Sequence, residues 1–141
     1  MKKILILVCM FVLSFSFISC GKDGSGILDE YEVQINFYAP DPEYPTIVPV
    51  GQGATFSIIA RKNGEVVDPS DVTISTSKDS TIGNLRIWND SGSVNIQSDS
   101  TINKKYGEIT GCKIGAMSGS GSFGFTATYK SATTDVTFST N

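Results

Sequence analysis

The chain has 141 residues, with 11 basic and 14 acidic side chains, a net charge of −3 and no histidine. This mildly acidic balance without a basic cluster argues against nucleic acid as a partner, because lysine and arginine contacts to phosphate dominate such binding. Without histidine, Ser-His-Asp, Cys-His and zinc-protease sites are excluded. We therefore expect no catalytic residue, no metal ligand and no cofactor, and the protein is predicted not to be an enzyme.

The amino terminus has the pattern of a secretory signal. Lys2 and Lys3 form a positive segment, and residues 4–18 form an apolar run interrupted only by two serines. This run is shorter than the roughly 20 residues that a membrane-spanning helix needs, and the polar sequence GKDGSG follows soon after it. An export signal over residues 1–19 is therefore favoured over an uncleaved membrane helix.

Phe17, Ile18 and Ser19 precede Cys20, and this stretch resembles the lipobox of bacterial lipoproteins. The resemblance implies cleavage before Cys20, diacylglycerol on its thiol and acylation of the new amino group. Each buried methylene contributes about 0.8 kcal/mol, so two or three acyl chains make a stable membrane anchor. The alternative is an ordinary signal-peptidase site that leaves Cys20 as a free thiol. The anchor predicts a cell-envelope protein of the outer membrane, on its periplasmic face or at the cell surface.

Residues 20–29 are rich in glycine with interspersed charge and are predicted to be a flexible tether that reaches about 15 Å. Removal of the signal, with its two lysines, leaves nine basic and 14 acidic side chains, a net charge of −5. This charge disfavours electrostatic docking on anionic lipid. Cys112 is the only cysteine of the predicted folded part, so no intramolecular disulfide is expected. Its thiol is predicted to be a small buried hydrophobe in a strand rather than a reactive group.

Residues 30–141 are predicted to form one all-β domain. Alternating apolar and polar residues predict a first strand at 31–37, and a proline-rich stretch unsuited to a central strand follows. Asn63 and Gly64 predict a type I′ turn between strands near 56–60 and 66–67. Further strands are predicted at 72–75, 85–88, 94–96 and 108–114, with a closing hairpin of 123–129 and 136–138. Since no segment has extended helical periodicity, the pattern indicates an antiparallel sandwich or barrel.

The order of these signals resembles the bacterial immunoglobulin-like domains of group 2. The resemblance spans residues 49–139 and rests on VPVGQGATFSIIARKNGEVVDPSDVTISTS, GEITGCKIG and GSFGFTATYKSATTDVTFS. Within these stretches the matching residues are Gly107, Ile109, Gly111, Gly115, Gly121, Phe123 and Phe125. It implies an antiparallel immunoglobulin-like β-sandwich used as a spacer, adhesion or interaction module of exported bacterial proteins, with no shared catalytic residues.

Two features distinguish the chain from that family pattern. Ile74 stands where the family often has tryptophan, and residues 78–104 replace a short connection. These additional residues are expected to form an extra hairpin at a sheet edge. The anchor followed by a small β domain also resembles the short lipoproteins of the Bacteroidota.

Aromatic residues are the candidate ligand contacts. Trp88, Tyr44 and Tyr106, together with Tyr38, lie in predicted loops or on predicted polar faces, where exposed rings stack on sugars or anchor protein contacts. The alternative for Trp88 is that its ring fills the core in place of the family tryptophan. Two functions follow: a non-enzymatic interaction, adhesion or structural module with an unknown protein partner, or a glycan-binding accessory lipoprotein of a polysaccharide uptake system.

The acidic residues carry less specific signals. Asp41 and Glu43 flank a proline and are predicted to be solvated surface groups rather than the acid/base pair of a glycosidase. Asp90 and Asp99 put oxygen ligands in loops without the alternating spacing of a calcium loop, so structural turns are predicted at both positions.

Overall fold

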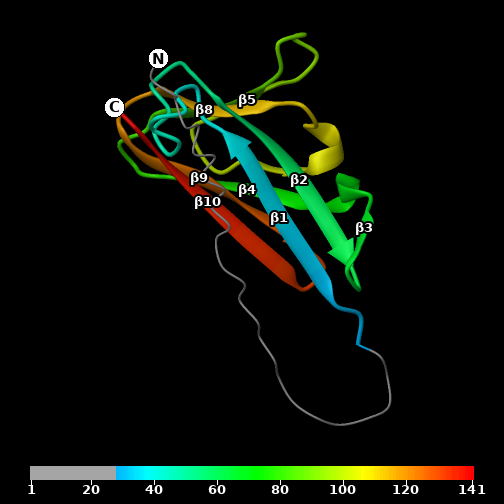
Figure 1. The fold of residues 1–141 in the computed structure, drawn as a ribbon. Helices are drawn as coiled ribbons and strands as arrows, with labels where there is room; N and C mark the ends of the chain where they lie inside the picture. The colour runs from blue at the N-terminus through cyan, green and yellow to red at the C-terminus, as the bar shows by residue number, and fades with distance from the viewer. Residues whose placement is uncertain (1–27) are drawn as a thin grey trace, which may run out of the picture.

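The computed structural model describes residues 28–141, so the predicted signal, Cys20 and most of the predicted tether lie outside the described residues. In this part of the chain ten strands form two antiparallel sheets that pack face to face (Figure 1). Two short 3-10 helices, η1 (Pro69–Asp71) and η2 (Tyr106–Glu108), connect strands. No helix among these residues has the length and apolar character needed to cross a membrane.

The larger sheet has six strands and runs in the order β1-β2-β8-β5-β6, with β3 also paired to β2. Its strands are β1 (Tyr31–Tyr38), β2 (Ala54–Lys62), β3 (Glu65–Val67), β5 (Asn84–Trp88), β6 (Asn95–Ser98) and β8 (Lys113–Ser118). The smaller sheet runs in the order β10-β9-β4-β7. Its strands are β4 (Thr73–Lys78), β7 (Asn103–Lys105), β9 (Gly121–Tyr129) and β10 (Ala132–Thr140).

The strand order is that of an immunoglobulin-like sandwich. Without the short β3, β6 and β7, the seven main strands pair as first-second-fifth-fourth and seventh-sixth-third, which is the ABED and GFC arrangement. The loop before β2 also joins β10 through a parallel bridge between Ile47 and Ser139. There the Val48 N–H donates to the Ser139 carbonyl oxygen at 2.9 Å. The predicted all-β antiparallel sandwich is confirmed.

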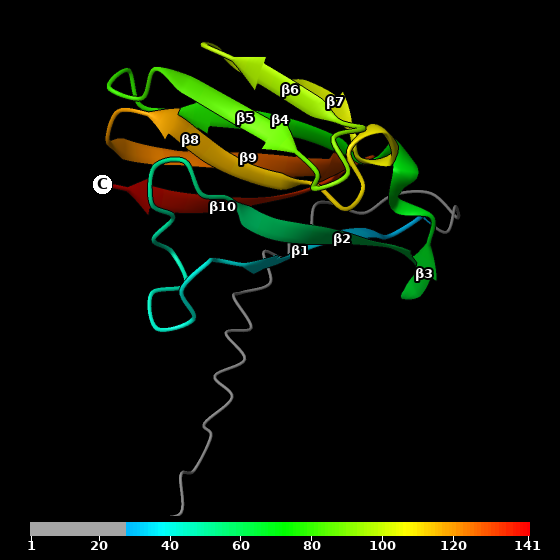
Figure 2. The same cartoon turned by 90° about the horizontal axis from the view of Figure 1, so that it is seen from above.

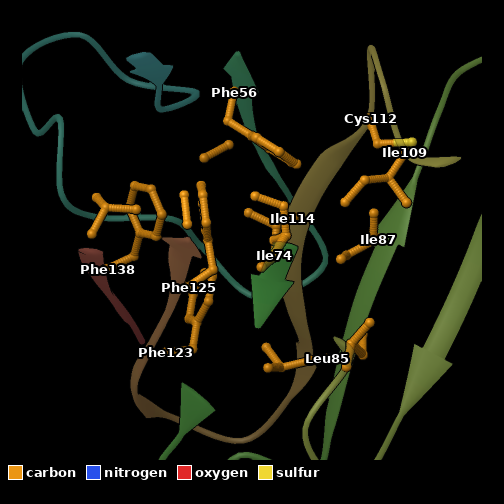
Figure 3. Close-up of a cluster of buried hydrophobic side chains, with 14 of the residues drawn as sticks. Phe56, Ile74, Leu85, Ile87, Ile109, Cys112, Ile114, Phe123, Phe125 and Phe138 are labelled. Atoms are coloured by element: carbon orange, nitrogen blue, oxygen red, sulfur yellow. The ribbon is translucent and has the colours of Figure 1, made fainter. Parts of the chain in front are cut away.

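The core lies between the two sheets because alternation sends every second side chain inward. Phe125 of β9 packs against Phe56 of β2, with ring centroids 4.8 Å apart, and Phe123 packs against Phe138 of β10 at 5.5 Å. Figure 3 shows this phenylalanine cluster on one side of the core. The buried side chains on the other side include Ile87, Ile109 and Cys112 (Figure 3).

Most predicted elements are confirmed, including the turn at Asn63 and Gly64, whose φ angles are +52° and +82°. The strand predicted at 108–114 is wrong: η2 and a turn with Gly111 at φ +74° occupy this stretch, and β8 begins at Lys113. Positive φ at Gly111 breaks the extended backbone that a strand requires. Cys112 therefore lies just before the strand, fully buried, and burial raises the pKa of its thiol.

The segment 78–104 contains the predicted hairpin at a sheet edge, formed by β5 and β6. It is more than an addition to the surface, because Leu85 and Ile87 of β5 are fully buried. The segment then crosses to the smaller sheet and supplies the start of β7, which the sequence pattern did not predict.

Candidate functional site

One row of side chains crosses the outer face of the larger sheet and contains two of the sequence-predicted aromatics. In register, Tyr38 lies beside Thr55, Thr55 beside Lys113, and Lys113 beside Trp88. Their inward neighbours are the core-facing residues Phe37, Ala54, Ile114 and Ile87. We call Tyr38, Thr55, Lys113 and Trp88 the outer row. Because neighbouring strands lie about 4.8 Å apart, the row spans about 14 Å.

Trp88 is half-buried on the outer face at the end of β5, so the interpretation that its ring fills the core is wrong. The ring edge lies on Gly53: a Cβ atom there would stand 2.6 Å from the Trp88 Cη2 atom. The Arg86 guanidinium carbon lies 5.2 Å from the ring centroid, and Arg86 Nε donates to Asn95 Oδ1 at 2.9 Å. The edge of the indole therefore rests on Gly53. Its face lies beside the Arg86 guanidinium in a favourable cation–π geometry, and that guanidinium is itself hydrogen-bonded.

Lys113 connects the row to the turn between β5 and β6. Its Nζ lies 2.6 Å from Asp90 Oδ1 in an ion pair whose acidic partner is largely exposed. The turn is held by Asn89, whose Oδ1 accepts from the Val94 N–H at 3.2 Å. Lys113 is therefore ion-paired with a residue of this turn. In residues 28–141, no three His, Cys, Asp or Glu side chains lie close enough together to hold a metal ion.

The remaining predicted aromatics lie in different environments. Tyr38 is 72% exposed at the end of β1, and Tyr44 is 55% exposed in the loop that follows it. Tyr44 is positioned by turn bonds, since its carbonyl oxygen accepts from the Ile47 N–H at 2.9 Å. Tyr106 is only 6% exposed and packs against Phe56 with centroids 6.1 Å apart. The expectation that Tyr106 is an exposed ring is therefore wrong.

Sequence reasoning missed the polar members of this site. Alternation alone places Thr55, Arg86 and Lys113 on outward faces, and this is the only signal for them along the chain. Arg86 lies on β5 two residues before Trp88, whereas the positions of Thr55 and Lys113 in the row depend on the pairing of β8 with both β2 and β5. Such pairing joins residues far apart in the sequence.

The smaller sheet carries two open depressions. One, of about 350 Å³, is lined by Asp71, Thr73, Lys105, Thr128, Tyr129 and Lys130. The other, of about 230 Å³, is lined by Ser77, Lys78, Asp79, Ser122, Phe123 and Thr137. Each contains a single carboxylate, so neither presents the carboxylate pair on which glycoside hydrolysis depends. Lys105 in the first is already engaged, because its Nζ donates to the Asp71 carbonyl oxygen at 2.8 Å.

Comparison of the chain with known protein families, with curated proteins and with solved structures gave no match. The resemblances to group 2 immunoglobulin-like domains and to bacterial lipoproteins therefore stay predictions from the sequence. The class of fold, an antiparallel immunoglobulin-like β-sandwich, stands independently on the strand pairing.

Proposed function

We propose that this protein is a lipid-anchored lipoprotein of the cell envelope whose immunoglobulin-like sandwich is a non-enzymatic interaction or adhesion module. The lipobox-like sequence at Cys20 supports the anchor. The outer row supports the binding role and is the observation that carries it. Trp88 and Tyr38 both lie outside the core, and aromatic rings are enriched at binding surfaces.

The sheet beneath the row explains why this face suits recognition. Each side chain of the row is set by a strand whose neighbouring residues are core-facing, so the spacing between the groups is set by the backbone ladder. Trp88 is further restrained by Gly53 and Arg86. Restraint before binding lowers the entropy that association costs. The row therefore presents pre-positioned groups to a partner.

The anchor is tested with Cys20→Ser in the full chain. We expect wild type to take up labelled fatty acid and to fractionate with membranes, and the variant to lose the label. Cys112→Ser is the matched control and should keep the label, because its thiol is buried in the sandwich. Labelling that persists in Cys20→Ser contradicts the proposed anchor.

Glycan binding is the second candidate function, and the length and chemistry of the outer row favour it. A span of about 14 Å matches a short oligosaccharide, with a ring at each end and the Thr55 hydroxyl and Lys113 ammonium between them. Aromatic faces pack on the apolar faces of sugars, while hydroxyl and ammonium groups hydrogen-bond to sugar hydroxyls. Both candidates place binding on the same surface.

A glycan array followed by calorimetry on the full chain separates the two candidates. For a glycan that binds, Trp88→Ala should weaken affinity at least tenfold, about 1.4 kcal/mol. Tyr44→Ala is the control, because this ring is exposed but lies outside the row. No binding to any glycan, or equal binding by both variants, rejects the glycan function.

A further inference from the structure

β1 is the long open edge of the larger sheet. Its eight residues pair with β2 in one uninterrupted register, and among residues 28–141 no other strand pairs with it. Figure 2 shows β1 as the outermost strand beside β2. The strand contains no proline, no lysine and no bulge, the devices by which sheet edges avoid pairing with other chains.

The other edges of the sandwich differ. β6 has four residues and β7 has three, and short edge strands resist edge-to-edge pairing. The β10 edge is partly covered, because Ser139 exchanges backbone hydrogen bonds with Thr46 and Val48. The long β1 edge is therefore the best place in the described domain for another strand to add.

The hydrogen-bond pattern shows which backbone groups of β1 are free. The Asn63 N–H donates to the Glu30 carbonyl oxygen at 2.7 Å, so this pair is a hydrogen-bonded one. In an antiparallel ladder such pairs alternate with non-hydrogen-bonded pairs. Even-numbered residues of β1 therefore direct their N–H and C=O groups toward β2. The residues that direct their N–H and C=O groups toward the open edge are Tyr31, Val33, Ile35 and Phe37.

The same four residues leave apolar surface incompletely covered. All four are only half-buried, whereas the inward residues of the neighbouring β2, Phe56, Ile58 and Ala60, are at most 5% exposed. An added strand would satisfy the free backbone groups and cover this apolar surface together.

We propose that the occupant is β1 of a second copy of this chain, paired antiparallel about a two-fold axis at Ile35. Such an axis requires the strand to be self-complementary. On the core side it places Ile35 opposite Ile35 of the second copy and Val33 opposite Phe37. On the outer face it places Gln34 opposite Asn36 and Glu32 opposite Tyr38.

Charge disfavours one neighbouring register, and the length of β1 disfavours another. Glu32 is the only charged residue of β1, and an axis at Ile35 separates the two Glu32 residues by about 20 Å along the strands. An axis at Val33 brings them within two residues of each other, about 7 Å, where like charges repel. An axis at Phe37 would place Pro40 opposite Gln34, but β1 ends at Tyr38 and the chain bends at Pro40, so the pairing would run past the end of the strand.

The dimer joins the two larger sheets into one continuous face with an outer row from each copy. Tyr38 of one copy lies beside Glu32 of the other. The inference stands on the geometry of β1 alone and holds whether the row binds a protein or a glycan.

Cysteine cross-linking in the full chain tests the pairing and its register. In a non-hydrogen-bonded pair the Cα atoms lie about 4.5 Å apart, within disulfide reach, and Gln34 and Asn36 form such a pair across the axis. When Gln34→Cys and Asn36→Cys are co-expressed with different tags and oxidised, we expect the mixed dimer to form at least tenfold faster than either homodimer. Thr55→Cys, on the same face but one strand inward, should stay uncross-linked. Absence of the mixed dimer, or equal rates for all variants, overturns the proposal.

Native mass measurement of the detergent-extracted protein gives a second readout. Wild type should be a dimer, and the double variant Gln34→Lys/Asn36→Lys should be a monomer, because each introduced lysine then faces another. The matched control Thr55→Lys/Ser57→Lys adds the same charge on β2 and should remain dimeric. A monomeric wild type, or a dimer that survives the β1 lysines, overturns the proposal.

Discussion

β9 in the middle of the smaller sheet and β1 at the edge of the larger one have the same kind of sequence pattern and different burial. Both alternate apolar or aromatic residues with polar or small ones. β9 lies between β10 and β4, and its inward Phe123, Phe125 and Ala127 are at most 1% exposed. β1 has β2 on one side only within the described chain, and its inward residues are half-buried. Alternation thus specifies which face a side chain occupies, while the number of neighbouring strands decides how deeply it is buried.

The largest effect should come from the centre. Phe125→Ala removes the ring that packs 4.8 Å from Phe56 and should cost about 3–5 kcal/mol of unfolding free energy, because the surrounding sheets cannot close the cavity. Denaturant unfolding of the full chain measures this loss. If Phe125→Ala lowers the unfolding free energy no more than Ile35→Ala does, then β9 is not buried more deeply than β1.

A buried hydroxyl in the neighbouring β4 should come next. Thr76 is 3% exposed, and its Oγ1 accepts from the Ile102 N–H at 2.7 Å. Thr76→Val keeps the shape but leaves this N–H without its acceptor, so we expect a loss of about 1–3 kcal/mol. Thr137→Val on the exposed face of β10 is the control and should change stability by less than about 0.5 kcal/mol. Equal costs would show that the hydroxyl of Thr76 is not a stabilising acceptor.

The edge itself should be more tolerant. Ile35→Ala is expected to cost about 1–2 kcal/mol, below the 2–5 kcal/mol typical of a fully buried isoleucine, because half-burial leaves less apolar area to lose. The measurement should be repeated over a range of protein concentrations, since dimerisation stabilises the folded state by mass action. A cost comparable to that of Phe125→Ala would mean that β1 is buried as deeply as β9.

The smallest effect concerns pH at the start of β1. Lys62 Nζ lies 2.9 Å from Asp29 Oδ2, and this hydrogen bond, with a further one from Asn63, lowers the pKa of Asp29 below its usual 3.8. The folded state then holds the carboxylate more strongly than the unfolded chain. The resulting stability is complete above pH 3.8 and is lost as the pH falls through the lowered pKa.

Thermal unfolding as a function of pH checks this contribution. Asp29→Asn should flatten the acid limb of the stability profile only slightly, because the Lys62 and Asp29 side chains are 42% and 41% exposed and solvent screens their interaction. Asp135→Asn, which removes an exposed carboxylate on β10 away from this ion pair, serves as the comparison. An unchanged profile in Asp29→Asn would show that the ion pair at the start of β1 adds no stability.

Local signals predicted most of the fold because they depend on residues close together in the chain. The turn at Asn63 and Gly64 needs two positive φ angles, which this dipeptide adopts readily. The strand predicted at 108–114 failed because the apolar pattern around Ile109 continued past Gly111, whose positive φ ends any extended run. Pattern alone does not tell a buried turn from a strand when both bury alternate residues.

The site was less predictable than the fold. Trp88 and Tyr38 were identified as candidate contacts from residue type and predicted location. Tyr106 is a tyrosine like Tyr38 and also has polar neighbours in the sequence. Its ring is nevertheless buried against Phe56. That contact joins residues 50 positions apart and follows from how η2 packs on β2, which no local signal reports.

By itself the sequence determined the all-β class, the inward and outward faces of most strands, the main turn and the lack of histidine chemistry. These follow from side-chain alternation, backbone preference and composition, all of which act locally. Only the tertiary structure decided that Tyr38, Thr55, Lys113 and Trp88 form one row, that Tyr106 is buried and that β1 is an open edge. Each of these depends on strand order and register, because hydrogen-bonded sheets bring together residues that are distant in the chain.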